Sequence, residues 1–146
     1  RPPTLELYRE RKNMLKYQLQ SGAKVEFNLG TIEQALGLYR ALIAECKHVG
    51  IDITVMEGET VLDVVMKNKE ALLNIMGSER VMECIKDCCA KVLYNGQKFS
   101  MDLFEDEKTR QDFFPLMILV GVENVRPFFP NLHTAYSIIL SLVLKQ

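Results

Sequence analysis

The stretch "KVEFNLGTIEQALGLYRALIAECKHVG", residues 24–50, decides the fold. Its first seven residues alternate apolar and polar side chains and end at a glycine, which is typical of a short, half-buried strand. From Thr31 the apolar residues recur every three or four positions, and Thr31 with Gln34 forms a capping box that predicts a helix start. Basic residues in the last turn and Gly50 predict where this helix ends. The sequence therefore predicts a strand that leads directly into a long amphipathic helix.

The expected buried face of this helix is an apolar stripe: Ile32, Ala35, Leu36, Tyr39, Leu42, Ile43, Cys46 and Val49. After it, residues 51–58 alternate Ile51, Ile53 and Val55 with polar residues, which indicates a second strand. Two short strands are not stable by themselves, so we expect helices to pack against them.

Helical patterns cover most of the remaining chain. We expect a basic N-terminal helix within residues 1–22 and further helices at 60–77, 78–96, 115–125 and 132–144. Arg126 precedes Pro127 and is expected to leave the helical region, so the helix that begins at Pro115 should stop there. Asn95 and Gly96 either end the helix before them or form a hairpin turn that leads into residues 97–104. The expected fold class is mainly α (α-rich α+β), a compact bundle of about five to six helices with one or two short strands. We expect a single domain over residues 1–146.

Composition argues against a disordered chain and against binding of nucleic acid through the overall charge. With 146 residues, 48% of them hydrophobic and 25% charged, the chain has the ordinary composition of a globular domain. The net charge of −1 provides no overall field for nucleic acid. Residues 1–24 hold six basic and two acidic residues, and this basic segment could contact nucleic acid. No aromatic residues are interleaved as in nucleic-acid motifs, so a solvated helix face is favoured.

The four cysteines are Cys46, Cys84, Cys88 and Cys89. The N-terminus is polar and basic and does not resemble a secretory signal, so we expect reduced thiols in a cytoplasmic protein. Cys84 and Cys88 lie one helical turn apart and could each offer a thiolate to zinc. No second pair stands at metal-binding spacing, so the pattern favours buried apolar cysteines, and neither a metal nor a cofactor is expected.

No catalytic motif supports an enzyme. Five acidic residues precede the apolar helix near residue 115: Asp102, Glu105, Asp106, Glu107 and Asp112. Carboxylates favour a helix N-terminus, and this reading is preferred to general acid–base chemistry. His133 and Ser137 lie one turn apart without an identifiable third residue to orient them. The sequence therefore predicts a protein that acts by binding.

Residues 127–146, "PFFPNLHTAYSIILSLVLKQ", combine a stiff Pro-Phe-Phe-Pro elbow with an apolar helix. The apolar run at 135–144 would be about 15 Å long as a helix, whereas a bilayer span needs about 20 residues. A membrane span is therefore not expected. A helix that is apolar nearly all round must be buried on several sides, and both a core and an interface remain open.

Several short motifs occur in a characteristic order along the chain: the strand and helix at 24–42, then "CCAKVLYNGQKFSMDLFEDEKTRQDFFPL" and "VGVENVRPFF". Over residues 24–130 this order resembles the tail assembly chaperones of tailed bacteriophages. The matching positions are Asn95, Gly96, Arg110, Asp112, Phe113, Asn124, Pro127, Phe128 and Phe129. The resemblance implies a non-enzymatic, α-rich protein of the host cytoplasm that binds the long tape measure protein and helps to recruit tail tube subunits.

The predicted partner-binding surface consists of seven residues: Phe113, Phe114, Phe128, Phe129, Tyr136, Leu140 and Leu144. The partner would be another protein, either a helical client or a second copy of this chain. Burial of these phenylalanines in the core is the competing interpretation, because Phe is usually buried. The alternative function is a fragment of an armadillo- or HEAT-like helical scaffold that mediates protein–protein interaction. A small α+β enzyme is the least favoured class.

Overall fold

The computed structural model describes residues 14–50, 74–130 and 133–145. The strand predicted at 51–58, most of the helix predicted at 60–77 and the beginning of the N-terminal basic helix lie outside these residues. The elements in chain order are β1 (Leu15–Gln18), β2 (Lys24–Phe27), α2 (Ile32–His48), α5 (Glu79–Asp87), β3 (Val92–Tyr94), β4 (Gln97–Lys98), η1 (Met101–Phe104), α6 (Glu107–Arg110), α7 (Phe113–Val125), η2 (Arg126–Phe128) and α8 (His133–Val143).

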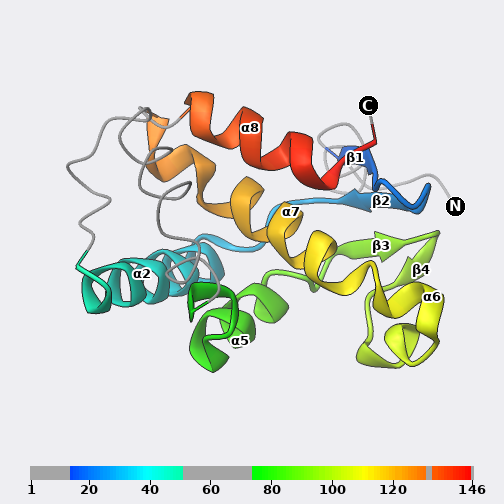
Figure 1. The fold of residues 1–146 in the computed structure, drawn as a ribbon, viewed down its shortest axis with the longest axis horizontal. Helices are drawn as coiled ribbons and strands as arrows, with labels where there is room; N and C mark the ends of the chain where they lie inside the picture. The colour runs from blue at the N-terminus through cyan, green and yellow to red at the C-terminus, as the bar shows by residue number, and fades with distance from the viewer. Residues whose placement is uncertain (1–13, 51–73, 131–132, 146) are drawn as a thin grey trace, which may run out of the picture.

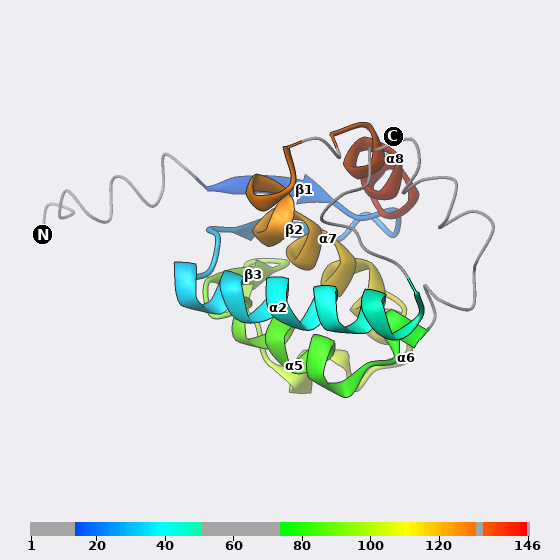
Figure 2. The same cartoon turned by 90° about the vertical axis from the view of Figure 1, so that its left-hand side faces the viewer.

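Helix α7 runs through the middle of the molecule (Figure 1). It contacts α8 on one side and α2 and α5 on the other, and α2 and α5 lie side by side (Figure 2). Most of α7 is buried, including Leu116, Met117, Leu119 and Val120. A helix that is apolar on nearly every side must be internal, and this sequence places α7 at the centre of the core.

The strands form one antiparallel sheet in the order β1-β2-β3-β4. A turn at residues 20–23 joins β1 to β2, and Gly22 adopts a φ of +96° there. Asn95 and Gly96 join β3 to β4 with φ values of 49° and 80°. Positive φ at both central residues is the signature of the type I′ hairpin turn, for which Asn-Gly is the preferred pair. The hairpin alternative at Asn95 is thereby confirmed.

The predicted fold class is wrong, because the described residues form a four-stranded sheet and not one or two strands in a helical bundle. Two of the strands lie where helices were expected: β1 within residues 1–22 and β3 within residues 78–96. In β1, Leu15, Tyr17 and Leu19 follow an alternation of period two, which fits a strand better than a helix. The structure is therefore that of an α+β domain.

The helix predicted after residue 30 is confirmed as α2, including its capping box. The Thr31 hydroxyl accepts from the Gln34 N–H at 3.2 Å, and the Gln34 side chain accepts from the Thr31 N–H at 2.9 Å. The predicted apolar stripe is partly wrong. Leu38, which lay outside it, is fully buried against the rest of the core, whereas Ile32 is 63% exposed. Contacts with α5 and α7 select the buried side of α2.

The last helices agree with expectation in position. Pro115 lies in the first turn of α7, which ends at Val125. Arg126 keeps helical angles, with φ −48° and ψ −44°, so Pro127 does not push it out of the helical region as expected; a single 3-10 turn follows instead. Helix α8 covers most of the helix predicted at 132–144. Within the described ranges, no helix is both long enough and apolar enough to cross a bilayer.

Candidate protein-binding groove

The structure places the seven predicted binding residues at several positions around α7. Phe113 and Phe114 begin α7, whereas Phe128 and Phe129 follow its C-terminal end. Because α7 has 13 residues, these pairs are about 20 Å apart along its axis. The two pairs therefore belong to different parts of the molecule.

Each pair joins its own aromatic cluster. Phe113 contacts Phe104 edge-to-face at 5.4 Å between ring centroids, and it contacts Phe114 at 5.5 Å. Phe128 and Phe129 lie against Tyr39 of α2, with centroids 5.3 and 5.2 Å away. Phe114 is 54% exposed, but Phe129 is buried.

The three remaining predicted residues come from the C-terminal segment. Tyr136 and Leu140 are buried in α8, and Leu144 is half-buried at its end. The Arg126 guanidinium lies over the Tyr136 ring, 5.9 Å from its centroid. Burial raises the pKa of Tyr136, and its hydroxyl makes no hydrogen bond to the described residues. Packing thus accounts for most of the predicted surface, and a role of these residues in binding stays a prediction.

An apolar groove lies between four helices. Its volume is about 260 Å³. The residues that line it are Leu38 and Leu42 of α2, Ile75 and Met76, Val81 and Ile85 of α5, Met117, Ile118, Gly121, Val122 and Val125 of α7, and Ile139, Leu142 and Val143 of α8. None of these side chains carries a nitrogen or oxygen atom. A group that enters the groove must therefore be apolar, because it finds no side-chain hydrogen-bond partner there.

The apolar surface continues out of the groove over α8. Leu142 lines the groove and is 67% exposed, and Ile138, one turn earlier, is 36% exposed. Both lie on the helix that the sequence showed to be apolar on more than one face. No sequence pattern indicates that residues of α2 and α5 complete the same groove, because they are distant from α8 in the chain.

Helix α7 separates this groove from the polar contacts of the sheet. Glu123 is buried beside Arg126, with 3.3 Å between Oε1 and Nη1. Burial and the Glu123 carboxylate raise the pKa of Tyr17 in β1. Asn124 accepts from the Gly30 N–H at 2.8 Å. The polar residues of α7 thus contact β1 and the turn between β2 and α2, while Ile118, Gly121 and Val122 line the groove.

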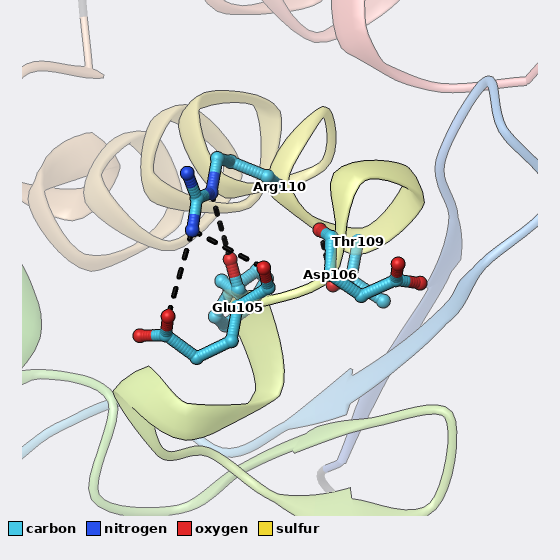
Figure 3. A network of polar contacts seen from close by, with 5 residues as sticks. Glu105, Asp106, Thr109 and Arg110 are labelled. Atoms are coloured by element: carbon cyan, nitrogen blue, oxygen red, sulfur yellow. Dashed lines mark hydrogen bonds and ion pairs between the residues drawn. The ribbon is translucent and has the colours of Figure 1, made fainter.

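Glu105 and Asp112 of the acidic cluster make separate contacts. Arg110 holds the turn between η1 and α6, because its guanidinium donates to the backbone oxygens of Phe104 and Glu105 at 3.1 and 3.2 Å (Figure 3). The Glu105 carboxylate lies 3.5 Å from the same guanidinium. Asp112 points elsewhere and accepts a hydrogen bond from the Tyr94 hydroxyl inside the protein. These contacts stabilise a turn and a core, and they leave the two carboxylates in separate environments.

The cysteines lie mainly in the core. Cys46, Cys88 and Cys89 are buried, and Cys84 is half-buried. Burial, and secondarily the Asp87 carboxylate, raise the pKa of Cys88 to about 11, and burial raises that of Cys89 to about 12. Within the described ranges, no three His, Cys, Asp or Glu side chains are grouped closely enough to hold a metal ion.

Comparison of the chain with protein-family models, with curated protein sequences and with solved structures found no match. The function must therefore be inferred from the groove and the surfaces around it.

Proposed function

We propose that this chain is a non-enzymatic protein-binding domain whose groove holds the apolar ridge of a helix from another protein. The observation that carries the proposal is a groove whose described lining consists of apolar side chains and which continues onto the exposed Leu142 and Ile138. Burying exposed apolar surface contributes about 25 cal/mol per Å², so a partner that covers these side chains gains affinity. Surfaces of this kind, larger than scattered single residues, mark interaction sites.

A helix fits the groove better than a small molecule does. Pockets for small ligands usually measure roughly 300–1,000 Å³ and contain a few polar groups that orient the ligand. This groove is smaller, at about 260 Å³, and the described residues that line it are all apolar. Along α7 its lining spans residues 117–125, about 12 Å, which corresponds to two turns of a partner helix. Anchors at positions i, i+3, i+4 and i+7 of that helix would enter it.

The resemblance to tail assembly chaperones suggests which helical partner this would be. A tape measure protein is a long helical chain with exposed apolar stripes. A groove without polar groups selects for shape and apolarity and not for a particular sequence, so it suits many similar segments of one long client. In this role the protein would act in the host cytoplasm and help to bring tail tube subunits to the client.

The alternative of a helical scaffold is supported less. An armadillo- or HEAT-like array consists of stacked helix pairs, each of which contacts its neighbours. Here a four-stranded sheet packs against the central helix, and residues on β1, β2 and β3 belong to the same hydrophobic core.

The test uses a synthetic amphipathic helical peptide with leucines at i, i+3, i+4 and i+7, labelled for fluorescence anisotropy. A peptide of the same composition in scrambled order is the reference. Leu142→Asp should weaken binding of the amphipathic peptide at least about tenfold, because it places a charge in the apolar groove. Met101→Asp is the matched control, since Met101 is also exposed, at 47%, but lies in η1 away from the groove. It should leave binding unchanged.

Three outcomes would reject the proposal. Equal binding of the scrambled peptide would show that the groove does not recognise the apolar stripe of an amphipathic helix. If the chain sediments as a dimer that Leu142→Asp dissociates, a second copy occupies the groove. If the peptide does not bind, and Leu142→Asp lowers the free energy of unfolding whereas Met101→Asp does not, residues of the same chain fill the groove.

A further inference from the structure

The side of α7 that lines the groove continues beyond it at the N-terminal end of the helix. Because an α-helix has about 3.6 residues per turn, residues four and seven positions apart share one side. Phe114 therefore lies on the same side of α7 as Ile118 and Gly121, which line the groove. The Phe114 side chain is 54% exposed. The apolar surface thus extends about 4.5 Å past Met117, the first lining residue of α7, and ends at an exposed aromatic ring.

An aromatic cluster holds this end of α7 in place. The Phe113 ring contacts the rings of Phe104 and Phe114, with 5.4 and 5.5 Å between centroids. Phe104 is buried and also contacts Tyr94 and Phe99, at 5.2 and 5.8 Å. The exposed ring of Phe114 therefore projects from a packed support. Binding to a side chain that is already positioned costs less ordering than binding to a mobile one.

A hollow in the surface lies about one turn before Phe114, where α6 leads into α7 (Figure 1). Its volume is about 380 Å³. The residues that line this α6 hollow are charged or polar: Glu105, Glu107, Arg110 and Gln111. Gln111 and Asp112 have helical backbone angles, with φ values of −62° and −87°, so the helical winding continues from α6 into α7. Residues three apart in a helix are neighbours, so Gln111 places the α6 hollow beside the Phe114 ring.

The two carboxylates of the α6 hollow differ in their contacts. The Glu105 carboxylate lies 3.5 Å from the Arg110 guanidinium, which also donates to two backbone oxygens (Figure 3). The Glu107 side chain is exposed and makes no hydrogen bond or ion pair with the described residues. Lys108 follows Glu107 directly, and adjacent residues of a helix do not face each other. The Glu107 carboxylate is thus open to a positive charge from a partner.

We propose that the helix held by the groove extends over Phe114 and carries lysine or arginine at that end, opposite Glu107. This inference rests on the proposed function, because it describes the partner of the same groove. From Phe114 to Val125 the apolar side of α7 is about 16 Å long, or about three turns of a partner helix. One turn beyond the last apolar anchor, a basic side chain would reach the α6 hollow. The partner is therefore an amphipathic helix with a basic end.

An acidic end is less compatible with this surface. It would bring like charges against Glu105 and Glu107, and such juxtaposition at an interface disfavours a partner. Charged pairs at the rim contribute more to selecting and orienting a partner than to affinity. The apolar groove would therefore supply most of the binding, and the α6 hollow would fix which end of the helix lies over Phe114.

The experiment compares three capped, fluorescent helical peptides with the same apolar anchors at i, i+4, i+7 and i+11. One carries two lysines after the last anchor, one carries two lysines before the first anchor, and the third has glutamines at all four positions. By anisotropy with the full chain, we expect one lysine peptide to bind about fivefold more tightly than the glutamine peptide. Glu107→Lys should remove this gain without changing binding of the glutamine peptide.

Glu33→Lys is the matched control for the charge. Glu33 is also an exposed glutamate in the first turn of a helix, in α2, so both substitutions have the same effect on a helix dipole. It should leave the binding of all three peptides unchanged. A similar loss in both variants would assign the effect to the net charge of the protein and would overturn the proposal.

Phe114→Ser tests the apolar part of the extension. It should weaken all three peptides about fivefold, because the partner loses an aromatic surface to cover. Met101→Ser is its control, since Met101 is 47% exposed and lies in η1, and it should leave binding unchanged. Both side chains are exposed, so both variants should unfold at the same urea concentration as the natural chain.

Failure of this inference can be told apart from failure of the proposed function. If the peptides bind but lysine brings no gain, or Glu107→Lys leaves the gain in place, the basic end is wrong and the groove stands. Unchanged binding to Phe114→Ser would show that the partner ends before this ring. A dimer in sedimentation that Phe114→Ser dissociates would assign the ring to a second copy. If no amphipathic peptide binds, both proposals are wrong.

Discussion

The side-chain oxygen of Asn124 accepts a hydrogen bond of 2.8 Å from the backbone N–H of Gly30, 94 residues earlier in the chain. The amide nitrogen of Asn124 donates to the Val120 oxygen, also at 2.8 Å, and the residue is 2% exposed. One buried side chain thus connects the turn between β2 and α2 to the central helix α7.

Replacing Asn124 by alanine should lower the free energy of unfolding by about 1–3 kcal/mol, because the Gly30 N–H loses its partner in a part-buried position. Chemical denaturation with urea measures this value. Gln97→Ala, at an exposed position in β4, should change it by less than about 0.5 kcal/mol. A similar effect of both substitutions would mean that the Asn124 hydrogen bonds contribute little.

Gly30→Ala should also destabilise the protein. A Cβ at this position would lie 2.9 Å from Gln34 Oε1 and 3.3 Å from the Cys88 Cα. The Gln34 side chain can move only by leaving the capping box, and the Cys88 Cα belongs to the backbone. We expect a loss of about 1–3 kcal/mol, typical of overpacking. Gly22→Ala is the comparison, because its added Cβ meets open space and only the positive φ is strained. If Gly30→Ala keeps the stability of the natural chain, the steric argument is wrong.

The Tyr94 hydroxyl donates to the buried Asp112 carboxylate, and Tyr94→Phe removes this donor. The carboxylate is then left without that partner, so we expect a loss of about 1–3 kcal/mol in the free energy of unfolding. Tyr39→Phe is the matched control, because the Tyr39 hydroxyl makes no hydrogen bond within the described residues while its ring also packs against aromatic side chains. Equal losses in the two variants would show that the hydrogen bond from Tyr94 to Asp112 contributes little.

The type I′ turn between β3 and β4 should tolerate glycine at position 95 but not alanine at position 96. Gly96→Ala places a Cβ on a residue with a φ of 80°, which costs about 1–2 kcal/mol. Asn95→Gly relieves the positive φ but loses the hydrogen bond that Asn95 Oδ1 accepts from the Lys24 N–H at 2.9 Å. Its net effect should therefore be smaller. Thermal unfolding of both variants gives the comparison, and the opposite order would show that the side-chain bond outweighs the backbone strain.

Stability should fall above pH 9. Burial raises the pKa of Cys88 from 9.0 to about 11 and that of Cys89 to about 12, so both thiols ionise more easily when unfolded. This contribution is complete below pH 9 and is lost as the pH rises toward the folded pKa values. The loss reaches at most about 1.4 kcal/mol per thiol for each pH unit. Urea denaturation between pH 8 and 11 measures it. Cys88→Ala should flatten the decline, and an unchanged slope would assign it to other groups, such as Tyr94, whose pKa burial and Asp112 also raise.

Thiol accessibility should distinguish Cys84 from the other cysteines. Cys84 is half-buried in α5, whereas Cys46, Cys88 and Cys89 are buried. A thiol-reactive dye should therefore modify one cysteine quickly and three slowly, and Cys84→Ser should remove the fast phase. Persistence of the fast phase in that variant would place another thiol at the surface.

Several elements were predictable because their signals are local. The Thr31–Gln34 capping box and the apolar pattern after it predicted α2, since both partners of a capping box lie within one turn of chain. Asn95-Gly96 predicted a possible hairpin turn. The groove was not predictable, because Leu42, Val81 and Leu142 come from three helices that are far apart in sequence.

The sequence by itself determined the start of α2, the position of α7 and the Asn-Gly turn, because capping, proline placement and positive φ depend on neighbouring residues. Only the tertiary structure decided that residues 15–18 and 92–94 form strands and not helix ends. A strand is stabilised by pairing with distant residues, and β2 lies between these two segments and supplies hydrogen bonds to both. The same long-range packing buried Phe129 and Tyr136 and left Leu142 exposed, because α7 and α2 cover some faces of the C-terminal segment and leave others open.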